Sequence, residues 1–255
     1  MQCGHVAQIG KALQNYHDQH GTFPPAYTVD EDGNPLHSWR TLILPYFAPG
    51  AIEQRWKDMY DQIRFDEPWD SEHNVQINEH VSRIVTEGRA EYPPNNEGPY
   101  SFNNMPSVYG CPTSVDDEVS TVYKMIVGDN AIGNLCGTSR SQIKRPQKTI
   151  LVIESGPPVL WMCHSDFAVE DFETAFYANE AFEIRREDVR KEDEELNITG
   201  TYRPKESALA QHQILGGKHS RQLYILFATG NVKIYWDWKL PLTEIEAMSR
   251  SREEP

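Results

Sequence analysis

The chain has 255 residues and a mass of 29.3 kDa, enough for one large domain or two smaller ones, each with a buried core. Its formal net charge of −14 repels phosphate backbones, which argues against nucleic acid as a partner. The 6 Trp, 12 Tyr and 9 Phe supply large apolar groups, so the chain is not disordered despite a mean hydropathy of −0.63.

The N-terminus carries an amphipathic helical pattern that begins at Val6 and is predicted to end near His20-Gly21. No N-cap residue precedes Val6, and no signal peptide pattern is present. The longest apolar runs, 42–44 and 224–228, are too short to cross a bilayer. Because a helix without a start signal is typical of the remainder of a longer one, we expect a further segment upstream of this sequence.

The middle of the chain mixes turn, helix and loop signals. A tight turn is predicted over 29–34, and the apolar stretch 36–44 fits either a strand or a buried helical turn. Helices are predicted over 52–60 and 74–86, and the Pro, Asn and Gly content of 91–107 indicates a loop.

The second half reads as strands interrupted by a charged helix. β-branched residues predict strands over 119–127 and 149–154, and alternation predicts a hairpin over 223–234 with its turn at 229–231. Mixed charges over 176–196 favour a solvated helix.

These elements predict an α+β fold. We divide the chain into an N-terminal helix, residues 1–21, and one α+β domain, residues 22–255, with a charged helical insert near 166–205.

Four cysteines are candidates for disulfides: Cys3, Cys111, Cys136 and Cys163. They lie far apart and form no CxxC pair, so they indicate neither a zinc ribbon nor a thioredoxin-type motif. They fit two disulfides in an oxidising compartment or four buried thiols in the cytoplasm.

The acidic run 66–72 is the candidate metal site. Calcium is bound by several oxygen ligands, which Asp66, Glu67 and Asp70 could supply from one loop. The competing and favoured interpretation is structural: Trp69 anchors the loop in the core, while Asp66 and Asp70 cap helices or turns.

The segment Cys163-His164-Ser165-Asp166 contains the residue types of a nucleophilic site. Catalytic groups must converge in space, however, and adjacent residues in one segment usually point apart. The favoured interpretation is structural, with Cys163 either buried or bonded to Cys136.

Six sequence blocks recur in the order of a known family. They are AQIGKALQNYHDQHGTFPPAY (7–27), PLHSWRTLILPYF (35–47), YDQIRFDEPWDSEHN (60–74), MPSVYGCPTS (105–114), KTILVIESG (148–156) and GGKHSRQLYILFATGNVKIY (216–235). With them the chain resembles the large planctomycete family of unknown function that has a prepilin-type N-terminus. Its members resemble type IV pilins and the major pseudopilin of type II secretion.

The resemblance implies a pilin-like fold, with a long N-terminal helix packed on an antiparallel sheet. It implies an upstream apolar helix that anchors the full-length protein in the membrane or packs in a filament core. The family's cysteine positions match Cys3 and Cys111, which implies a bridge between helix and domain. Closing that loop would contribute about 4 kcal/mol. Calcium binding by major pseudopilins adds weight to the acidic run 66–72.

We therefore expect a non-enzymatic structural or assembly protein outside the cytoplasm, at the cell surface or in the periplasm. Its partners would be copies of itself or pilin- and secretion-type proteins. Two alternatives remain open: a module that binds a solute such as a sugar or peptide, and a hydrolase that uses the region of Cys163 and His164.

Overall fold

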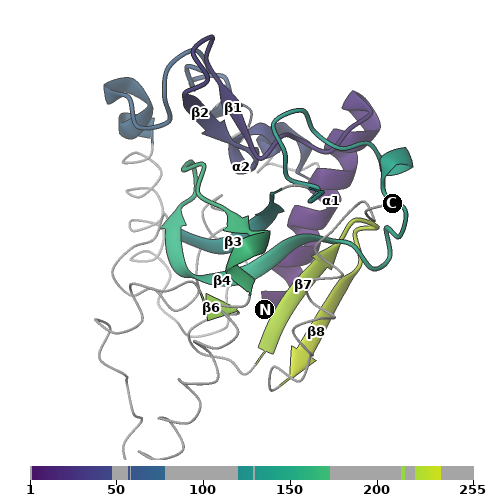
Figure 1. Cartoon of the computed structure of the whole chain (residues 1–255). Coiled ribbons are helices and arrows are strands. Elements are labelled where there is room, and N and C mark those ends of the chain that lie inside the picture. The colour runs from purple at the N-terminus through teal and green to yellow at the C-terminus, as the bar shows by residue number, and fades with distance from the viewer. Residues whose placement is uncertain are drawn as a thin grey trace, which may run out of the picture.

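The computed structural model describes residues 2–47, 57, 59–77, 120–128, 130–172, 214–215 and 222–236. These residues combine helices with a mainly antiparallel sheet, the α+β class that the sequence predicts (Figure 1). The predicted loop over 91–107, the charged helix over 176–196 and most of the predicted helices over 52–60 and 74–86 lie outside the described residues.

The first element, α1 (Gln2–His20), covers the predicted amphipathic helix. Its end is set by Gly21, whose φ of 78° suits glycine and whose N–H donates to the His17 carbonyl at 2.8 Å. Among the described residues, no helix combines the length and the apolar character that a membrane span requires.

A small hairpin and two short helices follow. Strands β1 (Tyr27–Val29) and β2 (Pro35–Ser38) pair in antiparallel fashion, and the Asp30 carboxylate closes their turn by accepting from the backbone N–H groups of Asp32 and Asn34. The chain then forms α2 (Trp39–Leu42) and a 3-10 turn, η1 (Leu44–Tyr46). The stretch 36–44 therefore contains both predicted structures, a strand followed by a buried helical turn.

The main sheet has the strand order β5-β3-β4-β7-β8, and β6 pairs with β4 outside that path. The strands are β3 (Ser120–Val127), β4 (Ile150–Leu160), β5 (Phe167–Ala168), β6 (Ile214–Leu215), β7 (Gln222–Phe227) and β8 (Val232–Trp236). All pairs are antiparallel except β3 with β5. The predicted hairpin is confirmed as β7 and β8, and the strand predicted over 149–154 continues to Leu160.

The strands β3, β4 and β7 are buried on both faces, and their apolar residues alternate between two clusters. On one face, the helix face, Met125, Val152 and Leu226 pack with Ile9 and Leu13 of α1. The other, the opposite face, is formed by these buried residues: Ile126, Ala131, Ile150, Ile153, Phe167, Phe172, Leu223, Ile225 and Phe227. Figure 1 shows α1 lying alongside β7 and β8.

Residues 166–172, which the sequence places at the start of the charged insert, belong to this core. Phe167 of β5 and Phe172, just after the 3-10 turn η3 (Val169–Asp171), are both fully buried, with ring centroids 4.7 Å apart. Residues 166–172 are therefore part of the folded core and not of a solvated insert.

α1 lies close against the sheet at Gly10. A Cβ at this position would lie 2.7 Å from Leu226 Cδ1 and 3.4 Å from the Gly230 carbonyl oxygen. A larger side chain would force α1 away from β7, because packed interiors leave little room for added atoms.

We expect Gly10→Val to lower the free energy of unfolding by about 1–3 kcal/mol through overpacking. The matched control is Ala7→Val, one turn earlier on the exposed side of α1, which should cost less than about 0.7 kcal/mol. Urea unfolding followed by circular dichroism measures both. Equal losses for the two variants would contradict the close packing of α1 on β7.

Candidate functional site: a buried ionic cluster at the edge of the sheet

Arg40 lies in the core, on the short helix α2, with no exposed surface. The β1–β2 hairpin delivers it there: Ser38, the last residue of β2, is the N-cap of α2, and its hydroxyl accepts from the Arg40 backbone N–H at 3.2 Å. Trp39 is also fully buried, and the Arg40 guanidinium carbon lies 4.9 Å from the centre of the Trp39 ring.

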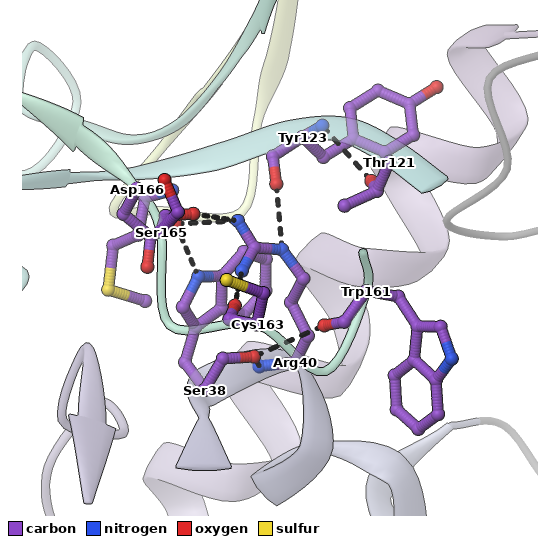
Figure 2. A network of polar contacts seen from close by, with 10 residues as sticks. Ser38, Arg40, Thr121, Tyr123, Trp161, Cys163, Ser165 and Asp166 are labelled. Carbon is purple, nitrogen blue, oxygen red and sulfur yellow. Dashed lines mark hydrogen bonds and ion pairs between the residues drawn. The ribbon is translucent and has the colours of Figure 1, made fainter. Parts of the chain in front are cut away.

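The Arg40 guanidinium donates mainly to the protein backbone. Its Nε donates to the Tyr123 carbonyl at 3.0 Å, and its Nη1 to the Cys163 carbonyl at 3.1 Å (Figure 2). Its Nη2 donates to the Ser165 carbonyl at 3.2 Å and to Asp166 Oδ1 at 2.6 Å. One side chain therefore joins three segments that are far apart in the sequence.

Asp166 Oδ1 is the acceptor at the centre of the cluster. Besides Arg40, it accepts from Trp39 Nε1 at 3.0 Å and from the Met125 backbone N–H at 2.8 Å. Burial raises the pKa of Asp166 to about 6, although Arg40 and these donors favour the charged form. At neutral pH, Asp166 is therefore ionised and pairs with Arg40.

The pair completes one edge of the sheet. β3 is bonded to β4 on one side, whereas on the other side β5 pairs only with Ile126 and Val127. The Tyr123 carbonyl and the Met125 N–H face this uncovered edge, where Arg40 and Asp166 bind them. Buried backbone groups need such partners. We call Arg40 and Asp166 the edge clamp.

Two further ionisable groups lie in the same part of the sheet. Lys124 is 1% exposed, and burial, reinforced by the nearby charge of Arg40, lowers its pKa to about 8. Glu154 is also 1% exposed, and burial raises its pKa to about 7 against a hydrogen bond from the Tyr224 backbone. Among the described residues, Glu154 Oε2 has no hydrogen-bond partner.

Lys124 and Glu154 lie on different faces of the sheet. Lys124 alternates with Tyr123 and Met125 of the helix face, so its side chain lies on the opposite face. Glu154 is the cross-strand partner of Tyr123 and therefore lies on the helix face. The two charges thus do not pair with each other across the sheet.

The structure describes two of the four candidate cysteines. Cys136 is exposed and Cys163 is half-buried, and both are free, so no Cys136–Cys163 bridge is present. The Cys3 side chain and all of Cys111 lie outside the described residues. The bridge between them, which the family resemblance implies, stays a prediction.

The His164 ring packs beside Tyr27. Its ring centre lies 5.5 Å from that of Tyr27, and its Nδ1 has no hydrogen-bond partner among the described residues. The backbone on either side of His164 is hydrogen-bonded, because the carbonyls of Cys163 and Ser165 accept from Arg40.

The acidic run forms a turn stabilised by its own neighbours. Glu67 accepts from Arg64 Nη1 at 2.9 Å and from the Ser71 hydroxyl at 2.8 Å, whereas Asp66 and Asp70 are exposed. Within the described ranges, no three His, Cys, Asp or Glu side chains come together as a metal ion would require. Trp69 packs against the core, as the structural interpretation of this run predicts.

Sequence reasoning missed Arg40, Lys124 and Glu154, and it named Asp166 only within the nucleophilic segment 163–166 and not as a buried ion-pair partner. Arg40, Lys124 and Glu154 each interrupt an apolar run: LHSWRTLIL, TVYKMIV and ILVIES. A charge inside a segment predicted to be buried needs a partner or a shifted pKa. Asp166 carries a weaker signal, because it lies between the polar residues His164 and Ser165 on one side and the apolar Phe167 on the other, at the border of an apolar run and not inside one.

A comparison with known families finds one match. The model of the family SBP_bac_10, described as "Protein of unknown function (DUF1559)", matches residues 1–157, and the chain therefore belongs to this family. The match includes Arg40, Lys124 and Glu154 and ends before Asp166. No curated protein matches the chain, and no solved structure does.

The edge clamp should dominate the stability of the fold. We expect Arg40→Met to lower the free energy of unfolding by about 3–5 kcal/mol, because Asp166 is left as an unpaired buried charge. Arg64→Met, which breaks the exposed Arg64–Glu67 pair, should cost less than about 1 kcal/mol.

Adding Asp166→Asn to Arg40→Met should restore part of the lost free energy of unfolding, because the unpaired Asp166 carboxylate is removed. Urea unfolding measures all three variants. If the two arginine variants lose the same small amount of free energy, the edge clamp does not hold the sheet edge.

Glu154 should make stability depend on pH. Its folded pKa of about 7 lies above its ordinary value of 4.5. The folded state therefore binds the proton more tightly, and stability falls as pH rises from about 4.5 to about 7. Relative to wild type, Glu154→Gln should gain up to about 3 kcal/mol above that window and close to nothing below it.

Glu31→Gln, on the exposed β1–β2 turn, is the matched control and should show no such trend. The measurement is urea unfolding of both variants and wild type at a series of pH values. A gain for Glu154→Gln that is independent of pH would show that the carboxyl does not titrate in the core.

Proposed function

We propose that this chain is a non-enzymatic, pilin-like structural or assembly protein that works outside the cytoplasm. The observation that carries the proposal is the placement of α1. One side of the helix, including Ile9 and Leu13, is buried on the sheet, and at Gly10 the helix leaves no room for a larger side chain. The other side exposes Gln8 and Lys11, which leaves a surface for a neighbouring subunit.

The buried ionic cluster supports a structural role. A catalytic group needs an atom that can reach a substrate, whereas the described donors of Arg40 are directed at three backbone carbonyls and the Asp166 carboxylate. The free thiol nearest to this cluster, Cys163, contributes its carbonyl to the clamp. The arrangement is suited to holding the domain rigid.

Family membership supports the proposal less directly, since the family is described as one of unknown function. The pilin-like interpretation rests on the resemblance to the planctomycete family with a prepilin-type N-terminus. An apolar segment upstream of α1 would anchor the full-length protein in the membrane, and a Cys3–Cys111 bridge would tie α1 to the domain. We propose both as parts of the same assignment.

The test is carried out with the full-length gene product, carrying an epitope tag, in the organism that encodes it. Cells are fractionated, and surface material is released by shearing. We expect the protein in the membrane fraction and, as assemblies, in the sheared fraction. Recovery of a cytoplasmic monomer only would overturn the proposal and favour a binding module or an enzyme.

A pair of charge reversals tests the role of α1. Lys11→Glu alters the exposed side of the helix, and Lys148→Glu makes the same change on an exposed loop before β4. If the exposed side of α1 is a subunit interface, Lys11→Glu should reduce the assembled fraction about tenfold, since like charges at an interface are costly. Lys148→Glu should leave it unchanged. Equal effects of the two variants would remove α1 from the interface.

A further inference from the structure

The C-terminal end of α1 is bound to a separate turn of the chain through one residue, Arg140. Its backbone N–H donates to His17 Nε2 at 3.1 Å, and its Nη1 donates to Asp18 Oδ1 at 2.7 Å. Its Nη2 donates to Gln14 Oε1. Arg140 begins the 3-10 turn η2 (Arg140–Gln142), so α1 and η2 are joined on one side of the helix.

The His17 contact requires a neutral imidazole. A backbone N–H can only donate, so the ring nitrogen that it meets must accept and cannot carry a proton. The proton of the neutral ring is therefore on Nδ1, which lies 3.8 Å from Asp18 Oδ1. A second proton, on Nε2, would place a donor against a donor and a positive ring beside the Arg140 guanidinium.

We propose that this contact between α1 and η2 is an acid-sensitive latch, which opens when the His17 ring takes up a second proton. The latch consists of His17, Gln14, Asp18 and Arg140. It goes beyond the proposed function, because it describes a response of the domain to pH whatever the domain assembles with.

The surroundings of His17 favour the neutral ring. Burial, and then the charge of Arg140, lower the pKa of His17 from its ordinary value of 6.5, while Asp18 acts in the other direction. From the segment after α1, the ring meets the uncharged Phe23 at a centroid distance of 5.0 Å. Among the described residues, the titratable and charged groups that face it are therefore Asp18 on α1 and Arg140 on η2.

The lowered pKa of His17 determines how the stability of the latch depends on pH. Because the folded-state pKa lies below the ordinary value, the latch contributes its full stability above pH 6.5. That contribution is lost as the pH falls through the folded pKa. The latch is closed at neutral pH and opens in mildly acidic solution.

Opening should be local. The loop that carries η2 is also held to the chain after α1 by two backbone hydrogen bonds, from Phe23 N–H to the Thr138 carbonyl at 2.9 Å and from Ala26 N–H to the Asn134 carbonyl at 3.0 Å. Neither involves a group that titrates. η2 also has its own capping bond, because the Ser139 N–H donates to Gln142 Oε1 at 2.8 Å. Only the turn 139–142 should leave the helix.

The test is an NMR pH titration of the 255-residue chain, combined with amide hydrogen exchange. The His17 ring and the Arg140 amide should titrate with one midpoint below 6.5. The protection factor of the Arg140 amide should fall about tenfold between about pH 7.5 and about pH 5. The Phe23 amide should keep its protection, because its bond to Thr138 does not titrate.

Two variants test whether protonation of His17 causes the acid response of the Arg140 amide. His17→Gln offers an amide oxygen that can accept from Arg140 but does not titrate, so the Arg140 amide should lose its acid response. His20→Gln removes the neighbouring histidine, which bonds the Tyr46 hydroxyl, and should leave that response intact. The proposal is overturned if the Arg140 amide does not respond to pH or if its response persists in His17→Gln. A simultaneous loss of Phe23 protection would show general unfolding instead of a latch, and would also overturn it.

Discussion

Among the described residues, no full strand covers one edge of β3, and the rest of the described structure depends on how the backbone groups of that edge are hydrogen-bonded. Arg40 donates to the Tyr123 carbonyl of this edge, and Asp166 accepts from its Met125 N–H. These two side chains therefore supply hydrogen bonds that a neighbouring strand would otherwise make. The same contacts fix α2 and the segment 163–166 against the sheet. A buried ion pair is costly to desolvate, but here it also supplies backbone partners, and removing one member would leave charge and peptide groups unsatisfied together.

The two charges beside the clamp show the cost of that arrangement. Burial shifts the pKa of both Lys124 and Glu154 towards the neutral form, as it does the pKa of Asp166. They lie on different faces of the sheet and cannot compensate each other. The core therefore holds ionisable groups whose charged forms weaken the fold, and in the clamp this cost is partly offset because Arg40 and the other donors favour the charged form of Asp166. Such a mixture is typical of a sheet whose strands are buried on both faces, because every polar residue in a strand must then enter one apolar layer or the other.

Much of this fold could be predicted from the sequence, and the exceptions have physical reasons. α1, the hairpin of β7 and β8 and the strands β3 and β4 follow from local periodicity and turn residues, which act over a few positions. The clamp could not be found in this way, because Arg40 and Asp166 are joined only by tertiary folding. The closely spaced residues Asp66, Glu67 and Asp70 suggest a metal site in the sequence. In the folded chain, however, Glu67 accepts hydrogen bonds from Arg64 and Ser71. The assignment of 166–172 to a charged insert gave weight to the three acidic residues of this stretch and underestimated its two buried phenylalanines.

The choice of acceptors around Arg40 has a consequence for how this family can change. Three of its partners are main-chain carbonyls, at Tyr123, Cys163 and Ser165, and every amino acid supplies that group. Substitutions at positions 163 and 165 can therefore leave the hydrogen bonds intact, provided that the backbone path is kept. Positions 40 and 166 have no such freedom, since a change at one removes the countercharge of the other. In relatives with the same sheet edge, these two positions should vary together, while the cysteine and serine between β4 and β5 should be replaced freely.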